Sequence, residues 1–298
     1  MLKYKIALIG AGKIAYSITN ALIKSGYGIQ FVASKKISSA RSLANKFSIK
    51  NYSNSLKNIP ESANVFFLTV PDGQIKKTAE VLSKTKKNFS DIICIHFSGV
   101  ENISALNSLM KKGCSTGSIH IIRPFPSKEI VDIRNSPASI ETEDKFARIF
   151  LIQLSKKFKL KPHFISSEEK VFYHLAAVHS SNFLVGNLFN AFILLGDKSD
   201  LPKNILKKTA QSALDNVFKL SPAKALSGPI DRGDLYTIKK HIKELDRKIK
   251  ERKNSSLVLL RKNYIIQSLS LLNVVRAKYG KLNNDHKRIE KLLKKELN

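Results

Sequence analysis

The sequence predicts an α/β protein with two domains: a doubly wound, mostly parallel sheet, then an all-helical C-terminal domain. A chain of 298 residues with 43% apolar residues is long enough for two globular cores. Short apolar runs alternate with helical stretches up to about residue 165, which is typical of right-handed crossovers and a sheet covered on both faces. Beyond that point no convincing strand pattern remains. We therefore place the sheet domain at residues 1–165 and the helical domain at 166–298.

The first half of the chain supplies the predicted sheet. Strands are predicted over residues 4–9, 29–33, 64–70, 91–97, 117–122 and 138–141. Helices are predicted over residues 14–25, 38–47 and 74–85. The first of these helices ends at Gly26, where a left-handed cap is easily formed. The run 64–70 is almost continuously apolar, which predicts a strand buried on both faces.

The second half reads as helices throughout. Ser166 and Glu169 stand in the register of a capping box, so a long helix is expected to begin there and continue to Leu195. Further helices are predicted over residues 203–220, 235–251, 255–279 and 285–297, the last a lysine-rich amphipathic surface helix. The apolar run 183–195 is too short to span a membrane, and we expect a buried helix, in either a monomer core or a dimer interface.

The net charge of +29 invites a nucleic-acid interpretation. The excess is mostly lysine spread along the whole chain, without an arginine-rich stripe interleaved with aromatic residues. This favours a solvated basic surface over a polyanion partner, and such a field would speed the capture of an anionic cofactor.

The N-terminal segment and the cysteines predict a cytoplasmic protein. The apolar run 6–9 is shorter than a secretory signal requires. Cys94 and Cys114 form no motif, so we expect two free thiols in a reducing compartment.

A glycine-rich turn lies between the first predicted strand and the first predicted helix. It reads Gly10-Ala11-Gly12-Lys13-Ile14-Ala15. The first glycine permits the tight turn, the second lets the backbone approach a pyrophosphate, and the small third residue lets the helix pack on the strand. The helix N-terminus then offers free N–H groups to the phosphates. This context predicts a Rossmann domain that binds a dinucleotide.

The end of the second predicted strand indicates which dinucleotide is bound. A site specific for NAD usually has an acidic residue there, to bond the ribose 2′-hydroxyl. This chain instead continues with Ser34, Lys35 and Lys36, which suit a 2′-phosphate. We therefore expect NADP in preference to NAD, with the alternative that the lysines belong to the general lysine excess.

Two further strand ends are expected to line the nicotinamide half of the site. Val70, Pro71 and Asp72 close the third predicted strand, and Ser98 closes the fourth. The carboxyl ends of parallel strands form one edge of the sheet, where such sheets bind ligands. For Asp72 a simple turn is the competing interpretation.

Polar residues interrupt the long apolar helix and the segment that follows it. His174 and Ser181 are seven residues apart and lie nearly on one face, with Asn182 adjacent. These groups need partners in either the protein or a ligand, and a core histidine bonded to backbone is the competing reading. Farther on, Arg232 could bind an anion bidentately, while Asp234 could simply cap the next helix.

The chain resembles a family of uncharacterised proteins in which a Rossmann-like domain precedes the domain of unknown function 2520. The resemblance is carried by residues 120–125, 172–183 and 225–234, the last reading Ala-Leu-Ser-Gly-Pro-Ile-Asp-Arg-Gly-Asp, followed by Thr237 and His241. The family is similar to pyrroline-5-carboxylate reductases and to the 6-phosphogluconate dehydrogenase superfamily. That relation implies NADP-linked oxidoreduction, a helical domain that closes over the nicotinamide, and a homodimer.

This chain departs from the family pattern at two places. The family's His-Pro-Leu-Gln-x-Phe segment is here His120-Ile121-Ile122-Arg123-Pro124-Phe125. The related hydroxyacid dehydrogenases carry a catalytic lysine one turn before an asparagine. If Asn182 matches that asparagine, the lysine position is Val178. A lysine-based mechanism is therefore not carried over.

The sequence predicts hydride transfer between NADP(H) and a small carbonyl or imine substrate in an interdomain cleft. His120 and His174 are the candidates for proton transfer, because histidine titrates near neutral pH. Ser98, Ser181 and Asn182 would position substrate oxygens, and Arg123 or Arg232 would neutralise a substrate anion. The rival hypothesis is a non-catalytic dinucleotide sensor or interaction protein on a dehydrogenase scaffold.

Overall fold

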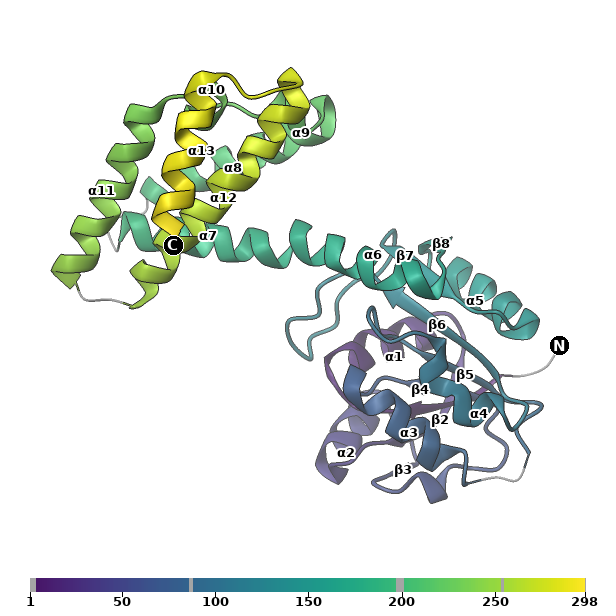
Figure 1. Ribbon diagram of the computed structural model, residues 1–298. Coiled ribbons are helices and arrows are strands. Elements are labelled where there is room, and N and C mark those ends of the chain that lie inside the picture. The colour runs from purple at the N-terminus through teal and green to yellow at the C-terminus, as the bar shows by residue number, and fades with distance from the viewer. Residues whose placement is uncertain (1–3, 86–87, 197–200, 253–254, 298) are drawn as a thin grey trace. The chain divides into compact units, whose positions relative to one another are not determined.

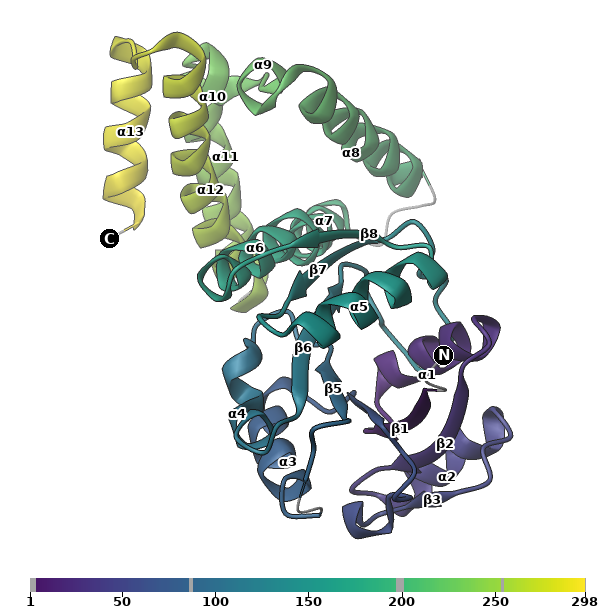
Figure 2. The ribbon, with the colours of Figure 1, turned by 90° about the vertical axis from the view of Figure 1, so that its right-hand side faces the viewer.

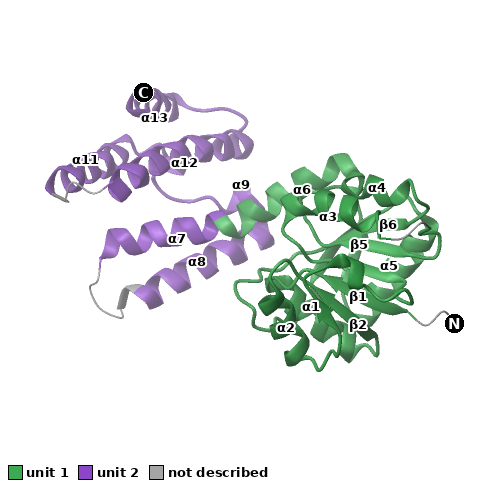
Figure 3. Ribbon diagram, turned by 90° about the horizontal axis from the view of Figure 1, so that it is seen from below, with its two compact units in different colours: residues 1–182 green, residues 183–298 purple. Residues whose placement is uncertain are grey.

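The protein consists of two compact units, which Figure 3 colours separately. The computed structural model describes all residues except 1–3, 86–87, 197–200, 253–254 and 298. The first unit covers Met1–Asn182 and contains the sheet, and the second covers Phe183–Asn298 and is helical. The two units are described one at a time.

A single sheet forms the first unit (Figure 1). Among the described residues it has eight strands: β1 (Lys5–Ile9), β2 (Gly28–Ala33), β3 (Tyr52–Ser53), β4 (Val65–Leu68), β5 (Ile93–His96), β6 (Ser115–Ile121), β7 (Pro137–Glu141) and β8 (Lys161–Phe164). Their spatial order is β3-β2-β1-β4-β5-β6-β7-β8. All neighbours pair in parallel except β6 and β7, which are antiparallel. This confirms the predicted doubly wound, mostly parallel sheet.

Helices cover both faces of this sheet, and Figure 2 shows α3 and α4 on one face with α1 and α2 on the other. The helices of the first unit are α1 (Lys13–Lys24), α2 (Ile37–Lys46), α3 (Ile75–Leu82), α4 (Asn107–Met110), α5 (Lys145–Lys157) and α6 (Ser167–Ser180). Short 3-10 turns are η1 (Leu56–Asn58), η2 (Asp72–Gln74) and η3 (Ile103–Leu106). Alternate residues of β1 enter opposite cores: Ile6 and Leu8 face one core, and Ala7 and Ile9 face the other. Continuous apolar strands thus fill both layers.

Strands β3 and β8 and helix α5 are among the elements of this unit that were not predicted from the sequence. Strand β3 has only two residues, and β8 reads Lys-Pro-His-Phe, a short polar edge strand with no apolar alternation. Helix α5 is amphipathic, and its N-cap Asp144 accepts a hydrogen bond from the amide of Ala147 at 2.7 Å. That cap is a signal from which α5 could have been predicted.

The helix expected from Ser166 to Leu195 is interrupted at Ser181. Helix α6 ends at Ser180 and α7 (Asn182–Leu195) begins two residues later. Ser181 leaves the helical conformation, with φ −124° and ψ −65°, and its hydroxyl donates to the carbonyl of Ala177 at 2.6 Å. Such a bond to the residue four positions earlier competes with the backbone ladder and bends helices. The predicted capping box between Ser166 and Glu169 is confirmed.

The compact units divide after Asn182, whereas the sequence analysis places the division after residue 165. The 17 residues between these points are α6 and its immediate flanks. Helix α6 groups with the sheet because Lys170 is buried there and bonded to residues of β6 and β7.

The second unit is built from helices only within its described residues. Besides α7 it contains α8 (Leu201–Leu220), α9 (Pro222–Ala225), α10 (Pro229–Arg232), α11 (Leu235–Arg252), α12 (Ser255–Tyr279) and α13 (Asn284–Leu297). Its core joins Ile230 of α10, Ile238 and Ile242 of α11, Ile265 of α12 and Ile289 of α13, among other residues.

The expectation that residues 183–195 form a buried helix is wrong for the single chain. Helix α7 is fully described and has no buried residue. Phe189 is 61% exposed and Val185 is 68% exposed. The apolar run therefore forms a helix whose apolar side chains are left open in one copy of the chain.

By length and composition alone, one helical stretch of the described residues, Ser167–Leu195, could cross a membrane. Its N-terminal part, however, is α6, in which Lys170 is fixed to the sheet. The part beyond Ser181 is α7, with 14 residues, whereas a bilayer requires about 20.

Candidate active site

The carboxyl ends of four neighbouring strands bring the candidate residues to one edge of the sheet. Strands β1, β4, β5 and β6 lie side by side and are parallel. Gly10 follows β1, Asp72 begins η2 after β4, and Ser98 follows β5, while His120 is the penultimate residue of β6. The topology thus joins residues that are more than 100 positions apart in the sequence.

The glycine turn after β1 has the shape that a pyrophosphate site requires. Gly10 has φ +113°, and a Cβ there would lie 2.5 Å from the carbonyl carbon and oxygen of Thr69. The Thr69 hydroxyl donates to the carbonyl oxygen of Gly10 at 2.8 Å, which fixes the turn against β4. Gly12 is the N-cap of α1, without a side-chain cap, and the first turn of α1 has no acidic residue. The N-terminus of α1 is therefore open to an anion.

The end of β2 fits a phosphorylated ribose. The amide of Ser34 donates to the carbonyl of Ser53 at 3.1 Å, which holds the chain at the strand end. Lys35 is exposed, and Lys36 is the exposed N-cap of α2, whose first turn has no acidic residue. Two lysines and a helix N-terminus favour the additional phosphate of NADP.

His120 and His174 form a pair at this edge. His120 comes from β6 and His174 from α6, and their ring centroids lie 5.5 Å apart with the planes at 66°. Gly99 makes this approach possible: a Cβ at Gly99 would lie 2.5 Å from Nδ1 of His174 and 2.9 Å from Nε2 of His120. Any larger residue at position 99 would displace one ring or both.

The environment of His120 keeps its ring neutral at physiological pH. Burial, the adjacent His174 and the ammonium of Lys170 lower the pKa of His120 to about 4, against a smaller opposing effect of Asp72. A neutral imidazole can accept a proton from a substrate. His174 has a buried Nδ1 for which the described residues provide no hydrogen-bond partner. A buried polar atom of this kind needs a partner, which a bound ligand or a water would supply.

His96, the last residue of β5, is fully buried. Burial, followed by the charge of Lys170, lowers the pKa of His96 to about 3. Nδ1 of His96 accepts the amide hydrogen of Ser98 at 3.3 Å, which assigns the proton of the neutral ring to Nε2.

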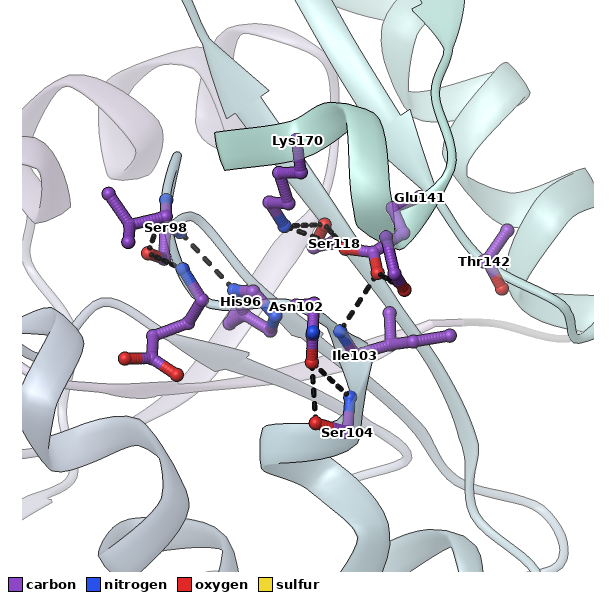
Figure 4. Close-up of polar contacts among 12 residues, drawn as sticks. His96, Ser98, Asn102, Ile103, Ser104, Ser118, Glu141, Thr142 and Lys170 are labelled. Atoms are coloured by element: carbon purple, nitrogen blue, oxygen red, sulfur yellow. Dashed lines mark hydrogen bonds and ion pairs between the residues drawn. The ribbon is translucent and has the colours of Figure 1, made fainter. Parts of the chain in front are cut away.

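Sequence reasoning missed Lys170. This side chain is 1% exposed, and its Nζ lies 2.8 Å from Oε2 of Glu141 and 2.6 Å from Oγ of Ser118 (Figure 4). Lys170 precedes His174 by four residues, so the two lie on the same face of α6. That spacing was the available signal for it. The sequence analysis looked for a lysine only one turn before Asn182.

The sequence predicts that Ser98, Ser181 and Asn182 position substrate oxygens, but all three already form hydrogen bonds within the protein. The hydroxyl of Ser98 accepts the amide hydrogens of Val100 at 3.1 Å and Glu101 at 2.9 Å, so it shapes the turn after β5. Ser181 donates to Oδ1 of Asn182 at 2.8 Å, and Asn182 is exposed at the start of α7. Because the helix breaks at Ser181, His174 and Ser181 do not continue one helical face as the spacing predicts.

The two candidate arginines lie in different units. Arg123 follows β6 in the first unit and is exposed. Arg232 is exposed at the end of α10 in the second unit. Asp234 accepts hydrogen bonds from the amide of Thr237 at 2.9 Å and from its hydroxyl at 2.6 Å, which confirms its predicted capping role.

Comparisons with known families confirm the resemblance noted in the sequence. Residues 136–255 match the model of the domain of unknown function 2520. Residues 5–96 match the model described as NADP oxidoreductase, coenzyme F420-dependent. The second match covers the glycine turn and the end of β2, and it bears out the expectation of an NADP-binding Rossmann domain.

Several solved structures share the fold. A Bacteroides fragilis protein, whose assignment as an NADP oxidoreductase is provisional, is 24% identical with a TM-score of 0.72, covering 94% of this chain and 99% of that one. A Thermotoga maritima protein is 25% identical with a TM-score of 0.63, covering 92% and 99%. A pyrroline-5-carboxylate reductase from Coxiella burnetii is 16% identical with a TM-score of 0.54, covering 98% of each chain. No curated protein matches the chain.

Proposed function

We propose that the protein is an NADP-dependent oxidoreductase that acts on a small carbonyl or imine compound. The observation that carries this proposal is the pair of His120 and His174, at the same sheet edge as the glycine turn. A dinucleotide site alone would serve a sensor equally well. A pair of half-buried rings, one kept neutral and the other with an unpartnered nitrogen, can move a proton.

The residues of the glycine turn would hold the cofactor pyrophosphate. Backbone amides of Gly12, Lys13 and Ile14 at the start of α1 would bind that group, and the close packing of Gly10 on Thr69 would let it approach the backbone. Ser34, Lys35 and Lys36 would hold the 2′-phosphate, and Val70, Pro71, Asp72 and Ser98 would border the nicotinamide. When bound, NADP supplies or accepts the hydride.

The histidine pair would handle the proton that accompanies the hydride. In the direction of substrate oxidation, a ring nitrogen of the pair accepts the proton of the substrate hydroxyl or amine as the hydride leaves its carbon. In the direction of reduction, the same nitrogen returns that proton. Arg123 and Arg232 are the proposed partners of a substrate anion, and Ser181 and Asn182 of substrate oxygens.

The test is a titration of the purified protein with NADPH and NADH, followed by nicotinamide fluorescence. We expect micromolar binding of NADPH by the wild type and weaker binding of NADH. Lys35→Ala/Lys36→Ala should weaken NADPH binding by about tenfold or more, the equivalent of about 1.4 kcal/mol, and leave NADH binding unchanged. Lys111→Ala/Lys112→Ala is the matched control, because it removes the same charge from exposed positions before β6, at the opposite edge of the sheet.

The outcomes separate the candidate functions. Absence of binding of either nucleotide would overturn the oxidoreductase proposal. Tight NADPH binding without turnover of any small carbonyl or imine acid would favour the dinucleotide sensor instead.

The exposed apolar side chains of α7 support a homodimer, and the state of the cysteines supports a cytoplasmic location. Val185, Phe189 and Phe192 are 68%, 61% and 43% exposed, and apolar side chains gathered on one helix mark interaction surfaces. Both cysteines are free and buried, as a reducing compartment would allow. Light scattering at micromolar concentration should give twice the mass of one chain, and Phe189→Asp should reduce it. A monomeric wild type would end the dimer proposal.

A further inference from the structure

Helix α6 and strand β6 meet through two successive side-chain contacts. Ser118 and His120 are two residues apart on β6, so they point to the same face with a spacing of about 6.6 Å. Lys170 and His174 are four residues apart on α6, with a spacing of about 6 Å along the same face. Lys170 contacts Ser118, and His174 contacts His120. Because the two spacings match, the contact of Lys170 with Ser118 sets the register in which His174 contacts His120.

Glu141 connects this first contact to the rest of the sheet unit. Its Oε2 accepts hydrogen bonds from Lys170 at 2.8 Å and from Ser118 at 3.2 Å. Its Oε1 accepts from the hydroxyl of Ser167 at 2.6 Å and from the amide of Ile103 at 3.1 Å. One carboxylate at the end of β7 therefore fixes β6, η3 and the first two turns of α6, as Figure 4 shows for several of these groups.

We propose that Lys170 is a positioning residue of the active site. Its bonds to Ser118 and Glu141 hold α6 in the one register that places His174 against His120, and its ammonium keeps a positive charge beside the pair. The inference rests on the proposed function only in that the pair is taken to transfer the substrate proton. The register and the charge are properties of the fold itself.

The charged groups around His120 allow the role of Lys170 to be tested through the titration of His120. His120 faces His174 and Lys170 from α6, and Asp72 from η2. Lys170 in turn faces Glu141 from β7, together with Asp72 and Glu101. Burial lowers the pKa of Lys170, and the hydrogen bond to Glu141 opposes that effect. A charged lysine next to His120 disfavours a second positive charge, so His120 stays in the neutral state that accepts a proton.

The experiment follows the ring Cε1–H signals of His120 and His96 by NMR as the pH is lowered, in the full-length protein. In Lys170→Met, the midpoint of His120 should rise by about one pH unit or more, because the cation is lost and Glu141 remains. In Glu141→Gln the midpoint should fall, because the cation is left uncompensated. Opposite shifts of the His120 midpoint in the two variants would show that the charge of Lys170 acts on His120. A general loosening of the packing would instead move the His120 midpoint of both variants toward the ordinary histidine value.

Two further variants complete the test. Ser118→Ala removes two hydrogen bonds at the same contact, one from Lys170 and one to Glu141, without changing charge, so its His120 midpoint should stay close to that of the wild type. Lys170→Met/Glu141→Gln replaces the ion pair by neutral side chains of similar size, and it serves if the single variants do not fold. Its His120 midpoint should also lie above that of the wild type. An unchanged His120 midpoint in a folded Lys170→Met or double variant would overturn the proposal.

NADPH binding by the same variants separates this inference from the proposed function. Lys170 lies outside the glycine turn and the end of β2, so its variants should bind NADPH as the wild type does. A wild type that binds no NADPH would end the proposed function, while the histidine titration would still decide the role of Lys170.

Discussion

The two units of this chain differ in how completely one copy buries its apolar residues. In the sheet unit, β1 and β4 are buried on both faces, and their side chains fill two cores. In the helical unit, α10 to α13 share one core, whereas α7 has no buried residue and Phe218 of α8 is 85% exposed. The sheet unit also exposes single apolar side chains, such as Phe146 and Phe172 at 72% and 75%. In the helical unit, by contrast, the whole apolar helix α7 is left for something else to cover.

The ion pair beside the histidines is more buried than the pairs of the helical unit, although the sheet unit also has an exposed pair, Arg134 and Asp132. Lys170 and Glu141 in the sheet unit are 1% and 3% exposed, and each has further hydrogen-bond partners. In the helical unit, Lys278 and Asp231 are 22% and 12% exposed, and Arg261 and Asp246 are 17% and 44% exposed. A buried pair is costly to break because it leaves an unpaired charge in the interior, while exposed pairs contribute little. The costly pair lies beside the histidines, where position matters most.

The largest expected effect comes from truncating one phenylalanine in each unit. Phe150 of α5 is fully buried, so Phe150→Ala should lower the free energy of unfolding by about 3–5 kcal/mol. Phe189→Ala on α7 should change it by less than about 0.5 kcal/mol in the monomeric chain. Urea unfolding followed by circular dichroism at nanomolar to low micromolar concentration measures both. A large loss for Phe189→Ala that grows with protein concentration would show that an assembly buries α7.

The next effect concerns pH and belongs to the sheet unit. His96 and His120 have pKa values lowered to about 3 and about 4, so the unfolded chain binds their protons first, below its ordinary histidine pKa of 6.5. Stability is therefore present above pH 6.5 and is lost as the pH falls toward 4. Each group accounts for a loss of about 2 kcal/mol at pH 5.

Matched histidine variants check the assignment of this loss. His96→Asn keeps an acceptor for the amide of Ser98 and should remove about half of the loss between pH 7.5 and pH 5, measured by thermal unfolding. His120→Asn should remove a similar share of the loss. A pH dependence of both variants equal to that of the wild type would contradict the assignment to these two histidines.

The architecture of the sheet unit could be predicted because the sequence patterns that indicate it are local. Apolar runs, the glycine turn and the capping box at Ser166 each arise from a few neighbouring residues, and each leads to the element observed. The histidines were identified as candidates, but not as a pair. Their contact depends on Gly99 and on how α6 lies against β6, which no local pattern encodes.

The misjudged features depend on distant partners. Lys170 reads as one more lysine in a basic chain until Glu141, 29 residues earlier in the sequence, is placed beside it. The apolar run of α7 predicts a helix that packs against other residues. The pattern does not say whether those residues belong to the same chain, and in one copy α7 has no buried residue. The interruption at Ser181 is different, because its hydroxyl bonds to Ala177 only four residues earlier, against an otherwise strong helical pattern.

The smallest expected effect comes from replacing one glycine in each unit by alanine, and the sign of the change in stability should differ between the two units. Gly186 lies within α7, and a Cβ there would have no atom within 4 Å, so Gly186→Ala should stabilise the isolated chain by about 0.5–1 kcal/mol through helix propensity. Gly99→Ala in the sheet unit should destabilise, because its Cβ would overlap the ring of His174. Thermal unfolding of both variants measures the difference in sign. If Gly186→Ala instead lowers stability and reduces the mass found by light scattering, close approach of another helix at Gly186 explains why this position in an apolar helix lacks a side chain.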